Sequence, residues 1–372
     1  MRSSISSSET AAQRLPHLPW TLLLGCALAL AAALVLAMET ALAVRGFRPT
    51  IVDSQAQWNE QRTRAAKLGK RALILVGDSR MQTDLDLDFM RAHSGLEPVE
   101  LAVSGSSFMP VFTGLASDPD ITSTILVGFS DAEVTRWNSV SESARYEADY
   151  EKQPHSSGLP DYRTSEALLE QRLHAGLTSY ADGATPLNTL LTRILDADAT
   201  SQYIVTLPDR SRVVDFSHAN LRSLNYRSAI FELEGDMPGS YKTEALPGLE
   251  RALRERIDGL NPADVAAYIA QSAQMEAAAQ SIQKRGGHVI FVVLPTSGYI
   301  VDIAHRAYPR ALFWDPFCKQ SSAQCLHFAD REDLRRFVPP DGLHLDQTDR
   351  AGFTAALIDA LALNRASAHA EK

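Results

Sequence analysis

Three short, continuously apolar runs constrain the fold of this chain more than any other feature. They span Ala72 to Val76, Val99 to Val103 and Thr124 to Gly128, and the stretches between them are long enough to hold helices. Continuous apolar runs at such spacing are typical of parallel strands in a sheet that is covered on both faces. We therefore predict an α/β fold with a parallel sheet and helices on both sides.

Further strands are expected later in the chain. The run from His288 to Leu294 predicts a fourth strand of the sheet, and the weaker run from Ala311 to Asp315 predicts a fifth. Between residues 136 and 261 the regular pattern loosens, which predicts a large insertion that shapes or covers a site rather than a separate domain. Within this insertion, the stretch from Ser201 to Leu221 predicts a hairpin outside the main sheet.

Helical segments are expected between and after the strands. Residues 45–70 predict either a short amphipathic helix or a linker. Pro262 and Asp264 indicate the start of a helix with proline at its first position, and Gly286 indicates its end. A last helix is expected from about Thr348 to Leu363, where apolar residues recur at helical spacing.

The N-terminal region carries a membrane signal. No charged residue occurs from Leu18 to Met38, which is about the length that a helix needs to cross a bilayer. We favour an uncleaved signal anchor, because this run exceeds the apolar core of an ordinary signal peptide. Two alternatives stay open: a signal peptide cleaved at an A-x-A site formed by Ala41 to Ala43, and a lipoprotein signal around Cys26.

The expected location of the main domain is the extracytoplasmic side of an inner membrane, the periplasm, with a single membrane pass. Arginines occur on both sides of the apolar run, so charge alone does not fix the orientation. Cys318 and Cys325 lie in a short loop that could close a disulfide outside the cytoplasm, two free thiols being the alternative. The expected parts are a cytoplasmic tail (1–17), the anchor (18–44), the linker (45–70), the main domain (71–365, with the insertion at 136–261) and a second tail (366–372).

Composition excludes some classes of partner. The chain has 372 residues, of which 45% are hydrophobic and 22% charged, as in globular proteins. Its net charge is −9 and it has no basic stripe, so we expect no nucleic acid partner. The cysteine pair lacks the third and fourth ligands of a metal site, so we expect no metal ion there. The sequence shows no cluster of metal ligands and the chemistry inferred below needs no metal, so we expect no cofactor.

Polar residues follow each of the first three predicted strands. They are Gly77-Asp78-Ser79, Ser104 to Ser107 and Gly128 to Asp131. Near the C-terminus, Asp341 precedes His344 by three residues. Because the carboxyl ends of parallel strands meet at the edge of the sheet that binds ligands, we expect these groups to lie together.

This set of residue types suits catalysis by an activated serine. A serine hydroxyl is a weak nucleophile and needs a base within hydrogen-bond reach, which is the role we assign to His344 for Ser79. A carboxylate on the other ring nitrogen fixes the tautomer and stabilises the imidazolium, which is the role we assign to Asp341. The backbone N–H groups of Ser79 and Gly105 could then face the developing oxyanion, each donor being worth roughly 3–4 kcal/mol of the barrier.

These blocks resemble the SGNH, or GDSL-type, hydrolases. The resemblance covers about residues 71–135 and 285–365 and rests on Gly77-Asp78-Ser79, Gly105, Gly128 to Asp131, and Asp341 with His344. It implies a three-layer, flavodoxin-like fold and the hydrolysis or transfer of acyl esters. By position it implies Ser79 as nucleophile, His344 as base, Asp341 as its orienting acid, and Ser79, Gly105 and Ser130 as the oxyanion hole.

The chain departs from the family pattern at one position. The family has an asparagine in its third block, and this chain has Ser130, whose hydroxyl is shorter and can rotate away. Three further residues are candidates for contact with substrate. Arg80 could bind an anionic group, and Asp131 and Ser297 follow predicted strands at the same edge.

The resemblance and the membrane signal together imply a function at the cell surface. We expect an anchored serine esterase or O-acyltransferase that acts on acyl esters, chiefly acetyl, of cell-surface or secreted polysaccharide. A membrane-bound acyltransferase is an expected partner. Two alternatives stay open: a non-catalytic assembly factor that binds glycan or a partner protein through a degenerate hydrolase fold, favoured by Ser130, and a lipid esterase or thioesterase, suggested by membrane proximity.

Overall fold

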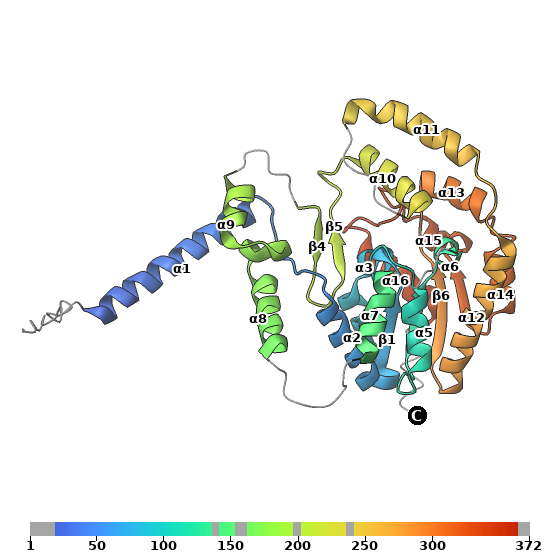
Figure 1. Ribbon diagram of the computed structural model, residues 1–372, viewed down its shortest axis with the longest axis horizontal. Coiled ribbons are helices and arrows are strands. Elements are labelled where there is room, and N and C mark those ends of the chain that lie inside the picture. The colour runs from blue at the N-terminus through green and yellow to red at the C-terminus, as the bar shows by residue number, and fades with distance from the viewer. Residues whose placement is uncertain (1–18, 136–140, 153–161, 196–201, 236–241, 364–372) are drawn as a thin grey trace, which may run out of the picture.

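The fold is seen in a computed structural model of the chain (Figure 1). The residues that the structure describes are 19–135, 141–152, 162–195, 202–235 and 242–363. The two predicted tails, at 1–17 and 366–372, lie outside them.

A five-stranded parallel sheet forms the centre of the protein, which confirms the predicted α/β fold. In spatial order the strands are β2 (Glu97–Glu100), β1 (Ala72–Val76), β3 (Thr124–Gly128), β6 (His288–Val293) and β7 (Gln324–His327). This is the order of flavodoxin-like doubly wound sheets, in which the direction of winding reverses between β1 and β3. Ligands bind such sheets outside the carboxyl ends of the strands at this reversal point.

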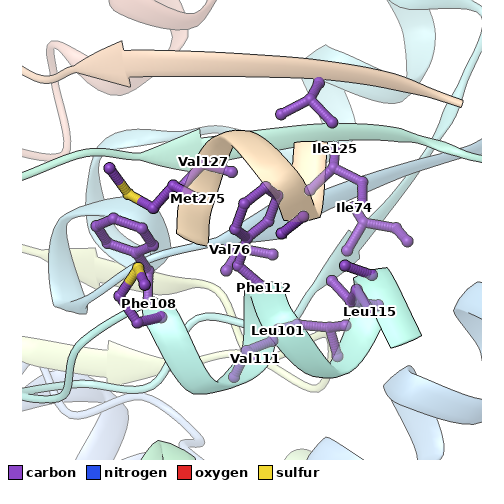
Figure 2. Packing of buried hydrophobic residues seen from close by; sticks show 14 of the residues in the cluster. Ile74, Val76, Leu101, Phe108, Val111, Phe112, Leu115, Ile125, Val127 and Met275 are labelled. Carbon is purple, nitrogen blue, oxygen red and sulfur yellow. The ribbon is translucent and has the colours of Figure 1, made fainter. Parts of the chain in front are cut away.

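Both faces of the sheet are buried, because successive side chains of a strand point to opposite faces. Ile74 and Val76 of β1 join the cluster formed with α5 (Met109–Ser117) and α12 (Val265–Lys284), part of which is seen in Figure 2. Leu73 and Leu75 join the opposite cluster, formed with α4 (Leu87–Ser94) and α16 (Arg350–Leu361). The domain is therefore a three-layer sandwich with helices on both sides of the sheet.

The α/β domain contains further helices. They are α2 (Gln55–Leu68), α3 (Ser79–Asp84), α6 (Asp131–Thr135), α13 (Tyr299–Ala307), α14 (Trp314–Gln320) and α15 (Glu332–Arg335). The start of α12 differs from the prediction, because Asp264 is the N-cap and accepts hydrogen bonds from the backbone N–H groups of Ala266 and Ala267. The helix therefore begins at Val265, and Pro262 precedes it rather than occupying its first position.

Two strand predictions need correction. The predicted fifth strand, Ala311 to Asp315, is wrong: this segment is a turn that leads into α14. Its aromatic residues are buried because Trp314 packs edge-on against Phe129, with ring centroids 4.9 Å apart. The fifth strand is instead β7, and β2 ends at Glu100 rather than Val103.

The region between residues 142 and 258 contains helices and one small sheet. The helical elements are α7 (Glu142–Lys152), α8 (Tyr162–Gly176), η2 (Thr178–Gly183), α9 (Pro186–Thr189), η3 (Leu190–Ile194), α10 (Leu221–Glu234), η4 (Thr243–Ala245) and α11 (Leu246–Asp258). Strands β4 (Ile204–Thr206) and β5 (Arg212–Val214) pair antiparallel, which confirms the predicted hairpin outside the main sheet.

The hairpin is tied to the main sheet by a buried arginine. Arg210, at its turn, is fully buried and its Nε lies 2.7 Å from Oδ1 of Asp53. The same guanidinium donates to the carbonyl oxygens of Glu100 and Ala102, at 2.7 and 3.0 Å. A fully buried guanidinium is stable only when it is paired in this way, so the hairpin has a fixed position against the end of β2.

A long apolar helix, α1 (Trp20–Val44), projects away from the α/β domain (Figure 1). It is long and apolar enough to cross a membrane, and the 18-residue window of highest hydropathy within it is not buried against the protein. Cys318 and Cys325 form a disulfide, with 5.9 Å between their Cα atoms. The apolar helix and the disulfide together indicate a protein of the secretory pathway or one anchored in a membrane.

Candidate active site

Ser79 occupies the first position of α3, directly after the strand β1 and a two-residue turn. The turn is fixed by Asp78, the N-cap of α3, which accepts a hydrogen bond of 2.9 Å from the backbone N–H of Arg80. The Ser79 side chain is half-buried and lies at the carboxyl end of the sheet. A serine in this place can present its hydroxyl to a ligand while its backbone stays rigid.

His344 lies within hydrogen-bond distance of this serine. Its Nε2 is 2.8 Å from Oγ of Ser79, although 265 positions separate the two residues in the chain. Its Nδ1 is 2.8 Å from Oδ2 of Asp341. The structure thus brings together the three residues that the sequence predicts as nucleophile, base and orienting acid, in the geometry that an acid–base relay requires.

The Asp341 carboxylate is held by its own turn. Its Oδ1 accepts hydrogen bonds from the backbone N–H groups of Leu343 and His344, at 3.0 and 2.8 Å. Gly342 adopts a φ of +98°, and a Cβ at this position would lie 2.9 Å from Cγ1 of Ile300. The D-x-x-H spacing therefore makes a closed turn in which only glycine fits the second position.

The electrostatics of the site favour the ionised forms of Asp341 and His344. Burial lowers the pKa of His344, but the Asp341 carboxylate, with smaller contributions from Asp84 and Asp78, outweighs burial and leaves the pKa above the usual histidine value of 6.5. Burial likewise raises the pKa of Asp341, and its interactions with His344 and two backbone N–H groups outweigh burial and lower it. The carboxylate therefore stays ionised and stabilises the imidazolium that forms when His344 takes a proton.

The loop that carries His344 is supported from two other elements. Ser297, predicted as a substrate contact, donates from Oγ to the carbonyl oxygen of Pro339 at 2.6 Å, and its backbone N–H donates to Gly342 at 3.0 Å. Asn225 of α10 donates to the carbonyl oxygen of Pro340 at 2.8 Å. Ser297 therefore holds the backbone of this loop through two hydrogen bonds.

Asp84 is a member of the site that the sequence analysis did not identify. It is fully buried at the end of α3, and its Oδ1 accepts hydrogen bonds from the backbone N–H of Leu345 (2.9 Å) and Oγ1 of Thr83 (2.8 Å). Burial raises its pKa to about 7, against the opposing charge of His344. Asp84 therefore links α3, which carries Ser79, to the loop that carries His344. No local sequence pattern marks this acid, so only the folded structure reveals its role.

The predicted oxyanion donors follow adjacent strands. Beyond β2 the chain stays bonded to β1, since Leu101 and Val103 donate to the carbonyl oxygens of Leu75 and Gly77, at 2.9 and 3.0 Å. These bonds bring Gly105, which has a φ of +67°, to the end of β1. A Cβ at Gly105 would lie 3.7 Å from the ring of Phe231 in α10. Helix α10 of the insertion thus approaches both the Gly105 loop and the Asp341 turn.

Ser130 follows β3, and its carbonyl oxygen accepts hydrogen bonds from the backbone N–H groups of Glu133 and Val134, at 3.1 and 3.3 Å. The next residue, Asp131, begins α6 and accepts a hydrogen bond of 2.6 Å from the hydroxyl of Tyr268. Burial raises the pKa of Asp131 to about 6, and the bond from Tyr268 opposes this effect. Asp131 therefore serves as the link between α6 and α12.

Arg80 is engaged in ion pairs within the protein. Its guanidinium lies 2.9 Å from Oδ2 of Asp78 and 3.6 Å from Oε1 of Glu133, and only 6% of the residue is exposed. Burial acts against ionisation of Asp78, but Arg80 outweighs it and lowers the pKa of this carboxyl. Burial and Asp78 hold the pKa of Glu133 well above its usual range. Arg80 is thus placed to stiffen the turn before the nucleophile.

No group of His, Cys, Asp and Glu side chains suited to holding a metal ion occurs in the part of the chain that the structure describes. A scan against protein-family models found none that matches the chain, and a search of curated proteins found no match either. The comparisons therefore identify no family for this α/β domain, and the functional argument rests on the geometry of the site.

Proposed function

We propose that this protein is a membrane-anchored serine esterase or O-acyltransferase of the SGNH type, with its α/β domain outside the cytoplasm. One observation carries the proposal: the chain of hydrogen bonds from Ser79 through His344 to Asp341, with 2.8 Å at each side-chain link. Its position at the carboxyl end of a doubly wound sheet supports the proposal, because ligands bind such sheets there.

In the proposed reaction, His344 Nε2 takes the proton of the Ser79 hydroxyl as Oγ bonds to the acyl carbonyl carbon. The tetrahedral intermediate then collapses, the bond to the alcohol breaks, and the leaving oxygen takes the proton from His344. This leaves an acyl group on Ser79. Water or a sugar hydroxyl then attacks, gives its proton to His344, and releases the acyl group as an acid or as a new ester while Ser79 regains its proton.

The oxyanion would be held by the backbone N–H groups of Ser79 and Gly105, with the hydroxyl of Ser130 as the third donor. Removing one such donor from other enzymes costs about 10²–10³ in kcat, so the hole supplies a large part of the acceleration. The rigid placement of the Ser79 and Gly105 backbones supports this assignment, since preorganised donors need no rearrangement during the reaction.

The substrate class follows from the resemblance and from the anchor. We propose acyl esters, chiefly acetyl, of cell-surface or secreted polysaccharide, with a membrane-bound acyltransferase as partner. The apolar helix α1 supports the location, because it would hold the site near such a membrane. Substitution of the family asparagine by Ser130 favours a second candidate function, a non-catalytic factor that binds glycan or a partner protein.

Hydrolysis of p-nitrophenyl acetate by the full-length protein in detergent tests the proposal. We expect release of p-nitrophenol that is lost in both Ser79→Ala and His344→Ala, with each variant folded by circular dichroism. A series of longer acyl chains separates acetyl chemistry from a lipid esterase or thioesterase, which would prefer the longer chains. A folded protein with no more activity than Ser79→Ala would overturn the enzymatic proposal in favour of the binding factor.

A further inference from the structure

A row of exposed leucines lies beside the end of the apolar helix. Leu187, Leu191 and Leu195 are exposed to 67%, 54% and 65% of their surface. Leu187 lies in α9, Leu191 lies in η3, which follows α9 without a break, and Leu195 is the residue that caps η3. Their spacing of four residues places them on one side of this segment. We call these three residues the leucine stripe.

The segment that carries the stripe is fixed to α1. The carboxylate of Glu39 accepts hydrogen bonds from the backbone N–H groups of Thr178 and Ser179, at 2.8 and 2.9 Å. Ser179 in turn accepts a bond of 2.7 Å from the hydroxyl of Thr189 in α9. Figure 1 shows α9 alongside the C-terminal end of α1, and the stripe therefore has a defined place relative to that end.

Further contacts strengthen this attachment. The guanidinium of Arg45 donates to the carbonyl oxygen of Arg193 at 2.8 Å, and Arg193 lies over the ring of Phe47, 5.1 Å from its centroid. Leu42, in the last turns of α1, is fully buried. The last turns of α1 and the segment from η2 to η3 thus form one packed unit.

The length of α1 places this unit at the surface of a bilayer. A hydrocarbon core of about 30 Å is crossed by about 20 residues of helix. Counted from Trp20, a residue type common at membrane interfaces, about 20 residues reach Glu39, so the far boundary of the core falls near this carboxylate. A carboxylate bonded to backbone N–H groups fits the headgroup region and is costly deeper in the membrane.

We propose that the leucine stripe inserts into the headgroup region of the bilayer that α1 crosses, as a second contact between the protein and the lipid. Apolar faces of interfacial helices bury about 5–10 Å into this region. Leu36 and Val44, which lie on either side of Glu39 in α1, are exposed as well, so this end of the helix also presents apolar side chains. Three leucines are too few for the about 800 Å² per partner that a stable protein interface buries, which argues against a second copy as the occupant.

A two-point contact of this kind restricts rotation of the α/β domain about α1 and keeps its orientation to the membrane fixed. The inference rests on α1 as a membrane span and is independent of the chemistry at Ser79. The native Cys26 lies in α1 and is the one cysteine outside the disulfide, so it can report the span separately.

The test uses the full-length protein in vesicles of equal parts phosphatidylcholine and phosphatidylglycerol that contain doxyl-labelled lipid. An environment-sensitive fluorophore is attached to native Cys26 in one sample, and to Leu191→Cys or Leu187→Cys in a Cys26→Ala background in others. The matched control is Ile269→Cys in the same background, an equally exposed aliphatic position on α12, far from α1 in Figure 1.

We expect a blue-shifted emission and quenching by the doxyl lipid at Cys26, at position 191 and at position 187, and neither effect at position 269. Quenching at Cys26 with a water-like signal at both stripe positions would overturn the inference while α1 still spans the membrane. A blue shift at the stripe without quenching, which fades as the protein is diluted in lipid, would assign the stripe to a second copy and also overturn it. No quenching at Cys26 would show that α1 does not span the membrane and would overturn the inference. Esterase activity of the same sample reports on the proposed function independently.

Discussion

Replacing Asp341 by asparagine separates the catalytic role of this carboxylate from its structural role. Asn keeps an oxygen that can accept the bonds now made to Oδ1 by the backbone N–H groups of Leu343 and His344, at 3.0 and 2.8 Å. In the parent protein, Oδ2 of Asp341 accepts a hydrogen bond of 2.8 Å from Nδ1 of His344. In the variant, the amide nitrogen of the asparagine would face this Nδ1 instead. The imidazole would then carry its proton on Nε2, and that nitrogen could no longer take the proton of Ser79.

The two effects differ in size. A wrong tautomer of this kind lowers kcat by about 10⁴ in Ser-His-Asp enzymes, which corresponds to roughly 5.5 kcal/mol of barrier. The loss of one hydrogen bond to a charged group costs about 1.5–3 kcal/mol of unfolding free energy, so the variant should stay folded. We therefore expect Asp341→Asn to lose nearly all activity while its unfolding free energy falls only moderately.

The assay is hydrolysis of p-nitrophenyl acetate, with denaturant unfolding measured on the same preparations. Asp346→Asn is the matched control, because Asp346 lies in the same loop and accepts bonds from the backbone N–H groups of Phe216 and Thr348, both at 3.0 Å, without touching His344. We expect this control to stay within about tenfold of the parent activity, a barrier change of about 1.4 kcal/mol. A folded Asp341→Asn with activity as high as the control would refute the reasoning.

Three further predictions concern pH and stability. Because the pKa of His344 is raised above the usual 6.5, kcat/KM should rise with pH through a value above 6.5. The stability that protonated His344 contributes is fully present below the unfolded-state pKa of about 6.5 and is lost as pH rises through the raised folded-state pKa. The pH profiles of kcat/KM and of denaturant unfolding check the two directions. Arg210→Met should lower the unfolding free energy by about 3–5 kcal/mol, because it leaves the Asp53 carboxylate without its closest buried partner, and chemical denaturation measures this. Replacing both disulfide cysteines with serine should cost about 2.5 kcal/mol, the chain entropy of a short loop, so an unchanged melting curve would contradict the loop-closure argument.

The strands that the sequence predicted correctly are those in the middle of the sheet. β1, β3 and β6 are continuously apolar because both of their faces are buried, and this makes the pattern visible without a structure. β7 lies at the edge and its four residues are all half-buried, so its sequence lacks that pattern. The aromatic run around Trp314 was predicted as a strand because aromatic residues are enriched in strands, but here they enter the core from the start of a helix.

In the candidate site, too, some residues could be predicted from the sequence and others could not. Ser79, Asp341 and His344 could be found because their blocks have a recognisable order and because the D-x-x-H turn is local. Asp84 and Asn225 could not, because their roles depend on contacts with the loop at 340–345, which lies more than a hundred positions away in the chain. A buried acid near the end of a helix has no local signature that separates it from an exposed one.

Covalent labelling tests the central claim most directly. The full-length protein in detergent is treated with a fluorophosphonate, which reacts with activated serines, and the modified residue is located by peptide mass spectrometry. The account predicts one adduct, on Ser79, that is absent from folded His344→Ala, because the base lies 2.8 Å from the nucleophile. A folded protein that gives no adduct on Ser79, or one that His344→Ala leaves unchanged, would contradict the account.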